Sequence, residues 1–462
     1  MVTSDSAART LINQTPSPTS PSRLLYYTLQ KAGNSSAPPG VSRPVMITPS
    51  LISSLTYDPR DEVSSYITLM GTIEGALNVR PSSIVEEIER SGLRGRGGAW
   101  FPTHLKWKAA TSTRRRPVVV VNATEGEPAS SKDALLMTTN PNLVIDGALV
   151  CAYATRATRV VFCVPPGLTS RVTEILQIRA KHSKTRIGLE VIGAPERYVT
   201  GEASALVNFI NTGAQAMPTF TQLLPVYRSG VANAPTIVQN AETLANVALI
   251  ARHGAGWFRT VGTAQSPGTV LLTLSGATRV PVVVEVEVGT TLRSVLGLVG
   301  DLTGPIQAVL VGGYGASWHS SRSILDTALA PESLQKLGGS LGPGVVFLLG
   351  AQYCPVSQLA GLARWMANQG AGQCGPCVSG LPAIATYLEV LAQSRAKADT
   401  PERVLSLCKL VESRGACHHP DGVARMVRSA LDVFRQDIEV HLARKSCGKS
   451  HKLSLPTHNV LA

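Results

Sequence analysis

Cysteines crowd the last quarter of the chain, and three of them are spaced as metal ligands are. The pair Cys374-Gly-Pro-Cys377 is followed some forty residues later by Cys417-His418-His419. A C-x₂-C pair with a soft ligand downstream is typical of metal sites. The three thiols and one histidine suit zinc, whereas an iron–sulfur cluster normally takes four thiolates. Unligated thiols stay an alternative, and a redox C-x-x-C pair is disfavoured because no thioredoxin-like strand precedes it.

A glycine-rich loop offers a second site. Gly95-Arg96-Gly97-Gly98 allows a ligand close to the backbone, supplies N–H groups and carries cations, and Lys106 follows. This combination suits a phosphate. It is not a dinucleotide fingerprint, because a helix precedes the loop and Trp100 stands where the third glycine belongs. A plain surface turn is the alternative.

Polar residues after an apolar run form a third candidate site. Asn122 and Glu125, in NATEGEP, follow the run PVVVV, which predicts a buried strand. Open α/β sheets hold ligands at the carboxyl ends of their strands. The alternative is a helix start, where acids lie near the positive end of the helix dipole.

The elements that position these residues predict an α/β protein with further domains. Apolar strands alternate with helical segments over about 80–260, short β runs with one amphipathic helix follow, and helical periodicity continues from Pro355. Ser, Thr and Pro dominate the first 55 residues. We expect five parts: a disordered arm over 1–55, an α/β domain over 60–262, a small α+β domain over 268–350, a helical bundle over 355–445, and a basic tail over 446–462.

Composition excludes several classes of protein. Hydrophobic residues make up 44% of the 462 residues and charged residues 16%, so the chain can bury several cores. Aromatic residues make up 5%, which disfavours nucleic-acid binding by base stacking. No uncharged apolar run approaches the ~18 residues of a membrane span. The net charge of +13 suits an anionic cofactor, an acidic partner or a membrane surface, and a solvated basic excess is the alternative.

Taken together and in this order, these segments resemble the NADH-binding flavoprotein subunit of respiratory complex I, a family shared with NAD-linked hydrogenases and formate dehydrogenases. The resemblance covers roughly residues 60–440. It rests on the segments SGLRGRGGAWFPTHLKW, NATEGEPASSKD, RYVTGEASAL, PTIVQNAETLANV, QCGPC and GACHHPDGV.

The resemblance implies a Rossmann-like FMN domain, a ubiquitin-like SLBB-type domain and a helical iron–sulfur bundle, in the ranges given above. It implies hydride transfer from NADH to FMN and electron transfer to a 4Fe–4S cluster, with no catalytic side chain beyond those that orient the cofactor. The residues that it implies for FMN are Gly95, Arg96, Gly97, Gly98, Lys106, Asn122, Glu125, Tyr198, Gly201, Glu202, Asn240 and Thr243.

The nucleotide site departs from the family pattern. Trp100 and His104 replace family glycines, Thr124 replaces an aspartate, and Ala203 replaces the second glutamate of a GEE motif. An indole at Trp100 is expected to shield the flavin face that nicotinamide would occupy, so Trp100→Gly should speed flavin reduction by NADH. Phe101 is kept. The aromatic segment of the family is LLPVYR here, with Tyr227 as a substitute.

The cluster motif is also incomplete. The first cysteine of the family pattern is Ala371, which leaves Cys374, Cys377 and Cys417. The fourth ligand is open between His418, His419, Cys354 and none.

The leading hypothesis is a flavin-dependent, NADH dehydrogenase-like oxidoreductase. Its donor is NADH, NADPH or a reduced protein, and its acceptor is a cluster or a ferredoxin-like partner or other subunit. The alternative is a non-catalytic scaffold of the same fold. We expect a cytoplasmic protein, peripheral at a membrane through a complex, without a transmembrane segment. If Arg96 pairs with the FMN phosphate, Arg96→Ala should release flavin.

Overall fold

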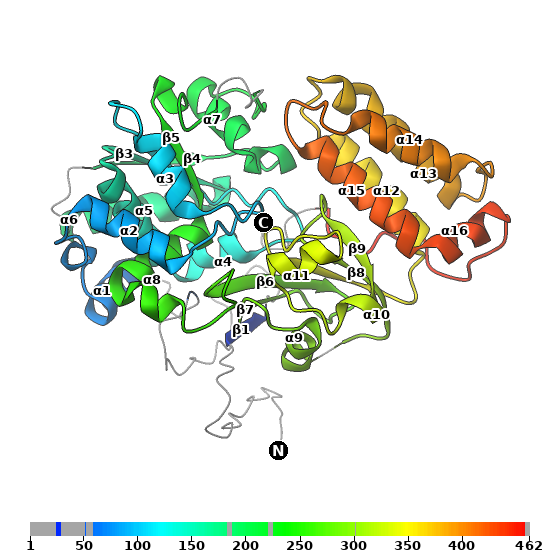
Figure 1. Ribbon diagram of the computed structural model, residues 1–462, viewed down its shortest axis with the longest axis horizontal. Coiled ribbons are helices and arrows are strands. Elements are labelled where there is room, and N and C mark those ends of the chain that lie inside the picture. The colour runs from blue at the N-terminus through cyan, green and yellow to red at the C-terminus, as the bar shows by residue number, and fades with distance from the viewer. Residues whose placement is uncertain are drawn as a thin grey trace, which may run out of the picture.

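The computed structural model describes residues 25–28, 51, 59–182, 187–219, 225–300 and 302–457 (Figure 1), with the backbone alone for 25–28 and 59–61. An α/β region, a second sheet and a helical bundle make up this part of the chain, as Figure 1 shows from left to right. The predicted fold class, α/β with further sheet and helical parts, is confirmed.

The α/β region is built on a four-stranded parallel sheet in the order β4-β3-β2-β5. Its apolar side chains alternate between two clusters. Val119 and Val121 pack with residues of α5 (Pro141–Thr155) and α8 (Ala241–Phe258), while Val118 and Val120 pack with residues of α7 (Ala203–Thr212). A parallel sheet covered on both faces in this way is Rossmann-like. The strands are β2 (Val118–Asn122), β3 (Arg159–Val164), β4 (Gly188–Gly193) and β5 (Thr236–Asn240).

Helices of this region surround the sheet and supply several of the site loops. The bent pair α4–α5 is the only described stretch whose length and apolar character approach those of a membrane span, and it turns by 98°. No single described helix does so. The helices are α1 (Pro59–Met70), α2 (Pro81–Ser91), α3 (Thr103–Thr111), α4 (Lys132–Thr139), α5 (Pro141–Thr155), α6 (Thr169–His182), α7 (Ala203–Thr212) and α8 (Ala241–Phe258).

The second sheet has six strands in the order β1-β7-β6-β10-β8-β9, and only β6 and β10 pair in parallel. The short β runs predicted within 268–350 become β6, β7, β8 and β10, whereas the polar strand β9 has no such signal in the sequence. The elements are β1 (Leu25–Thr28), β6 (Thr269–Gly276), β7 (Val282–Glu287), β8 (Ile306–Val311), β9 (Ser317–Ser320), β10 (Val345–Gly350), α9 (Leu292–Val299), α10 (Ser321–Ile324) and α11 (Pro331–Lys336).

Parts of the N-terminal arm and of the basic tail belong to the folded structure. Residues 25–28 pair with β7, and Leu51 is buried, which differs from the disorder expected for residues 1–55. The remainder of that arm lies outside the described residues. In the tail, Leu455 is buried and Tyr314 donates a hydrogen bond to the carbonyl of Pro456. Leu271 of the second sheet packs in the same core as residues of the α/β region, so the two parts share buried contacts. The proposed domain boundaries stay a prediction.

The C-terminal bundle carries the cysteine pair at an irregular turn. Residues Pro376–Gly380 form a π-helical turn that leads into α13. Such turns often lie at functional sites. The helices are α12 (Pro355–Gln369), α13 (Leu381–Ala392), α14 (Thr400–Val411), α15 (His419–Val433) and α16 (Arg435–Leu442).

Candidate cofactor and cluster sites

Two asparagines mark the carboxyl edge of the parallel sheet. Asn122 ends β2 and Asn240 ends β5, and the two residues are partners in the strand register. The Asn122 amide donates to the carbonyl of Gly201 over 3.0 Å. A Cβ atom on Gly97 would lie 3.1 Å from the Cβ of Asn240, so the glycine loop passes close to the same edge. Four segments that are distant in the sequence therefore meet where open α/β sheets bind ligands.

Arg96 ties the glycine loop to the second sheet. Its guanidinium donates to the carbonyls of Arg94, Pro267 and Thr269, and its backbone N–H donates to the Thr243 hydroxyl over 2.8 Å. Burial lowers the pKa of Arg96 to about 10, and the side chain is 1% exposed. These donors are occupied by the protein itself, which differs from the phosphate contact expected for Arg96.

Trp100 points into the second sheet. Its indole N–H donates to the carbonyl of Gly342 over 2.8 Å, the Arg96 guanidinium lies 4.3 Å from the ring centre, and 5% of the residue is exposed. The ring packs in the core of the second sheet. The indole is therefore held against the second sheet, and the expectation that it covers a flavin face stays a prediction. Its φ of 50° still belongs to the left-handed region that favours glycine.

Lys106 brings an unpaired cation to this edge of the sheet. It lies on α3, and its ammonium has one recorded bond, to the carbonyl of Val238 at 3.4 Å. Burial lowers its pKa, and among the described residues no carboxylate pairs with it. Lys108, two residues later, is exposed and pairs with Glu89 over 2.5 Å. A largely buried ammonium without a counter-ion fits the phosphate of FMN.

Glu125 caps a helix. Its carboxylate accepts hydrogen bonds from the Ser130 hydroxyl and from the backbone N–H groups of Asp133 and Ala134, at 2.6, 3.0 and 2.7 Å. Burial, and to a lesser extent the nearby Asp133 carboxylate, raise its pKa to about 7. The helix start that was the alternative for this segment is thus present. Glu125 positions the loop that follows Asn122.

A buried charged network beneath Asn240 was not found from the sequence. The Lys132 ammonium contacts Asp133 at 2.8 Å, Glu242 at 3.0 Å and the Asn240 amide oxygen at 3.0 Å. Burial would lower the pKa of Lys132, but the carboxylates of Asp133 and Glu242 raise it above its ordinary value. The network fixes the Asn240 side chain at the end of β5. The one sequence signal for this network is the pair of adjacent opposite charges, Lys132 and Asp133, at the start of α4.

The segment Tyr198–Gly201 connects the sheet edge with the bundle. Gly201 accepts the bond from Asn122, and the next residue, Glu202, caps α7. The backbone N–H of Tyr198 donates to the side chain of Gln369 over 3.2 Å, and its ring lies 5.4 Å from that of His419. A short segment thus contacts both predicted cofactor sites.

The two residues expected at the nicotinamide nucleotide are accessible. Phe101 is 46% exposed and Tyr227 is 38% exposed. The segment LLPVYR that carries Tyr227 begins at residues 223–224, outside the described part of the chain. Their roles stay a prediction.

Cys374, Cys377 and Cys417 come together in the bundle. Burial, a hydrogen bond with Cys374 and the charges of Cys374 and Cys417 raise the pKa of Cys377 to about 12. Backbone hydrogen bonding at Gly372 and His419 acts in the opposite direction and lowers the pKa of the Cys377 and Cys417 thiols. Hydrogen bonds to cysteine sulfur are a feature that tunes iron–sulfur clusters. The donor set fits three corners of such a cluster.

The candidates for a fourth ligand can be separated by position. Cys354 precedes α12, at the opposite end of this helix from Ala371, and 15 residues of helix span about 22 Å. Cys354 is therefore excluded. His418 is exposed, with its side chain 93% accessible, and pairs with Asp421 over 2.9 Å. His419 is 7% exposed; its Nε2 contacts the carbonyl of Met366 at 2.9 Å, and its Nδ1 is buried without a partner.

Comparisons with known proteins agree with this arrangement. Residues 88–249 match the family described as the Nuo51 FMN-binding domain, and residues 357–441 match the NADH-ubiquinone oxidoreductase-F iron-sulfur binding region. The chain is 30% identical to the F 2 subunit of NADH-quinone oxidoreductase in Rhizobium meliloti, over 79% of this chain and 90% of the relative. It is 29% identical to the F subunit of the Escherichia coli enzyme, over 82% and 88%.

Among solved structures, an NAD⁺-reducing [NiFe]-hydrogenase chain in its H₂-reduced state superimposes with a TM-score of 0.74 and 28% identity. The match covers 82% of this chain and 66% of the hydrogenase chain. With the sheet edge, the cysteine group and these matches, the chain belongs to the family of F subunits of NADH-quinone oxidoreductase.

Proposed function

We propose that this chain is an FMN-binding, NADH-oxidising electron-transfer subunit of its family. The observation that carries the proposal is the segment around Tyr198, which contacts Asn122 at the sheet edge through Gly201 and the cysteine group of the bundle through His419. FMN, when bound, accepts a hydride and releases electrons one at a time, and this chemistry needs an acceptor nearby. The short connection between the two sites meets that need.

The residues of the chain bind and orient in this proposal. Lys106 holds the phosphate of FMN, while Asn122 and Asn240 present polar groups at the strand ends. Arg96 keeps the glycine loop in place from behind. Tyr198 packs against the bundle beside Trp365 and His419, and burial of its phenol raises its pKa.

For the cluster, we propose Cys374, Cys377 and Cys417 as thiolate ligands and His419 as the fourth. His419 has its Nε2 engaged with a carbonyl, which leaves the Nδ1 lone pair free. Burial lowers the pKa of His419 to about 4, so the ring is neutral and able to ligate. His418, which carries its imidazole in solvent, is not needed for the cluster.

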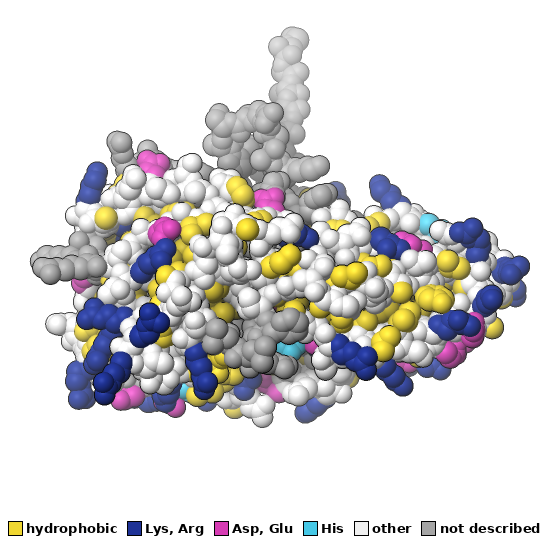
Figure 2. All heavy atoms as spheres, turned by 90° about the horizontal axis from the view of Figure 1, so that it is seen from above, with side chains coloured by type: hydrophobic (Ala, Val, Ile, Leu, Met, Phe, Trp, Pro, Cys, Tyr) yellow, Lys and Arg dark blue, Asp and Glu magenta, His cyan; other side chains and the backbone are white. Residues whose placement is uncertain are grey.

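The partner that drains the electrons is proposed to be an acidic electron-transfer protein or subunit. Basic side chains lie along both the α/β region and the bundle on the face shown in Figure 2. With a net charge of +13, this surface attracts acidic proteins by electrostatic steering. Assembly into a larger complex, peripheral to a membrane, belongs to the same proposal.

The test is an anaerobic absorbance spectrum of the purified protein before and after NADH is added. Flavin bands that bleach support the proposal, whereas a colourless protein supports the scaffold alternative. Flavin that NADH leaves oxidised would point to another donor.

Lys106→Met removes one charge-assisted contact, worth about 1.5–3 kcal/mol, and should weaken FMN binding roughly 10- to 100-fold. Lys108→Met, on the same helix but paired with Glu89, is the matched control and should bind FMN normally.

A further inference from the structure

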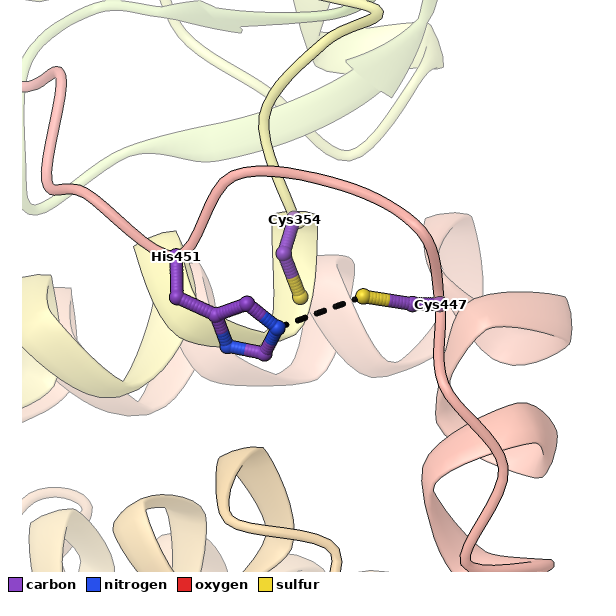
Figure 3. Close-up of side chains that lie close together, drawn as sticks. All are labelled: Cys354, Cys447 and His451. Carbon is purple, nitrogen blue, oxygen red and sulfur yellow. Dashed lines mark hydrogen bonds between the residues drawn. The ribbon is translucent and has the colours of Figure 1, made fainter.

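A second group of cysteine and histidine side chains lies at the start of α12, away from the cluster cysteines. The ligand atoms of Cys354, Cys447 and His451 all lie within 4.8 Å of one another. Figure 3 shows the three side chains pointing toward one another, Cys354 from the residue before α12 and the other two from the C-terminal segment. The Cys447 sulfur is 3.4 Å from Nε2 of His451.

A fourth ligand comes from α16. Nε2 of His441 lies 3.3 Å from the Cys354 sulfur, and the rings of His441 and His451 are 5.8 Å apart. Zinc bonds of about 2.3 Å to sulfur and about 2.0–2.1 Å to nitrogen place neighbouring S and N ligands of a tetrahedron about 3.6 Å apart. The two S···N separations match this edge. The group therefore has the donors of a Cys₂His₂ site, with Cys354, Cys447 and His451 close together and His441 reaching the Cys354 sulfur from α16.

Each histidine has a partner for Nδ1, which leaves its Nε2 facing the cysteine sulfurs. Nδ1 of His441 contacts the Ser394 hydroxyl at 3.1 Å, and Nδ1 of His451 contacts the Ser357 hydroxyl at 2.7 Å. A partner on the second ring nitrogen is what metal-bound histidines almost always have. Because His451 is exposed, packing in a core does not explain why its ring is held by the Ser357 hydroxyl.

The donor set selects the metal. Two thiolates and two imidazoles in a tetrahedral arrangement suit Zn²⁺. A [4Fe–4S] cluster normally takes four thiolates, and this group has two. Cys354 is 0% exposed and His441 1% exposed, so one side of the ion is enclosed, while Cys447 and His451 close it from the surface.

We propose that Cys354, His441, Cys447 and His451 bind a structural Zn²⁺ ion that fastens the C-terminal segment to the start of α12. Three of these residues lie outside the matched iron–sulfur region, residues 357–441, and His441 is its last residue. The backbone already follows this path, since the N–H of Cys354 donates to the carbonyl of Ser450 over 2.8 Å. The site is a feature of this chain, independent of the flavin function proposed above.

The test measures zinc and iron in the purified full-length protein by mass spectrometry. We expect about one zinc ion per chain in the wild type. Cys447→Ser and His451→Ala, both near the surface, should reduce zinc to less than about a tenth while iron and flavin stay unchanged. His418→Ala, an exposed histidine paired with Asp421, is the matched control and should retain zinc.

A second measurement keeps the test independent of folding and of activity. Co²⁺ exchanged into the site should show the visible bands of a tetrahedral ion and a sulfur-to-cobalt charge-transfer band, both absent from Cys447→Ser. Three outcomes would overturn the proposal. They are a wild type that fails to bind added Zn²⁺, a disulfide between Cys354 and Cys447 in the unreduced protein, and iron in place of zinc that disappears in Cys447→Ser.

Discussion

Helix α12 carries a group of cysteines at each end, and the two groups are built differently. Near its C-terminal end lie Cys374, Cys377 and Cys417, and backbone hydrogen bonds at Gly372 and His419 act against the rise in pKa that burial causes at Cys377 and Cys417. At its N-terminal end, thiols and imidazoles gather, and the imidazoles are held by hydroxyl groups. Backbone donors on thiolates stabilise the negative charge of a cluster, while hydroxyls on imidazoles fix ligand orientation for one ion. The support around the ligands separates the two sites as clearly as the ligands do.

The largest effect should come from a crossed pair of substitutions. Cys374→Ser should remove nearly all iron and leave zinc in place, because a cluster cannot persist on the two thiolates that remain. Cys447→Ser should do the reverse. Zinc and iron are measured in each variant, with both variants purified in parallel by the same procedure. Loss of both metals from either variant would show that the two groups form one site.

The support of the zinc ligands gives the next effect. Ser394→Ala removes the hydroxyl that holds His441, and such losses typically weaken metal binding about tenfold or more. Competition with a chromophoric chelator measures the affinity. Iron content is the internal control, since Ser394 does not contact the cluster cysteines in any recorded bond. Unchanged zinc affinity would mean that packing alone orients His441.

The fourth cluster ligand should have a smaller effect. With three thiolates intact, His419→Ala should lower the iron retained through purification roughly two- to threefold and alter the electron paramagnetic resonance of the reduced cluster. His418→Ala should leave both unchanged, because that imidazole lies in solvent. If the two variants gave the same spectrum, His419 would not be the fourth ligand, and the iron without a cysteine at position 371 would have no protein ligand.

Trp100→Gly should leave both metals at wild-type levels. The loss of a buried indole costs about 3–5 kcal/mol of unfolding free energy, offset in part by relief of its left-handed backbone, which costs about 1–3 kcal/mol. Chemical denaturation measures the difference, and metal analysis of the same sample provides the comparison. Loss of iron or zinc would show that the glycine loop supports a metal group at a distance.

Much of the fold could be predicted from the sequence, because its signals are local. The run of valines at 118–121 predicts β2, and the apolar runs from residue 269 onward predict most of the second sheet. The polar strand Ser317–Ser320 carries no such pattern, and it forms because β8 offers a free edge. Similarly, β1 lies among Ser and Pro residues, and its place depends on β7.

The site residues were predicted as a group, but not always their roles. The sequence shows that Arg96 and Trp100 lie in a glycine-rich loop. It does not show that their partners are Pro267 and Gly342, because those contacts join residues 171 and 242 positions apart. In the sequence, the motif Cys447-Gly-Lys-Ser-His451 is part of a basic tail. Its Cys and His spacing indicates a metal site only when the fold places Cys354 beside it.

The position of Cys447 and His451 along the chain also sets an order of events during synthesis. All thiols of the Cys374 group have been made by Cys417, whereas His451 follows some 34 residues later. At about 5–20 residues per second, this interval lasts roughly 2–7 s. During that time Cys354 lacks the partners that complete its site, because His441, Cys447 and His451 are all made after Cys417. The ribosome therefore presents the cluster ligands first, and zinc can close the last loop only afterwards.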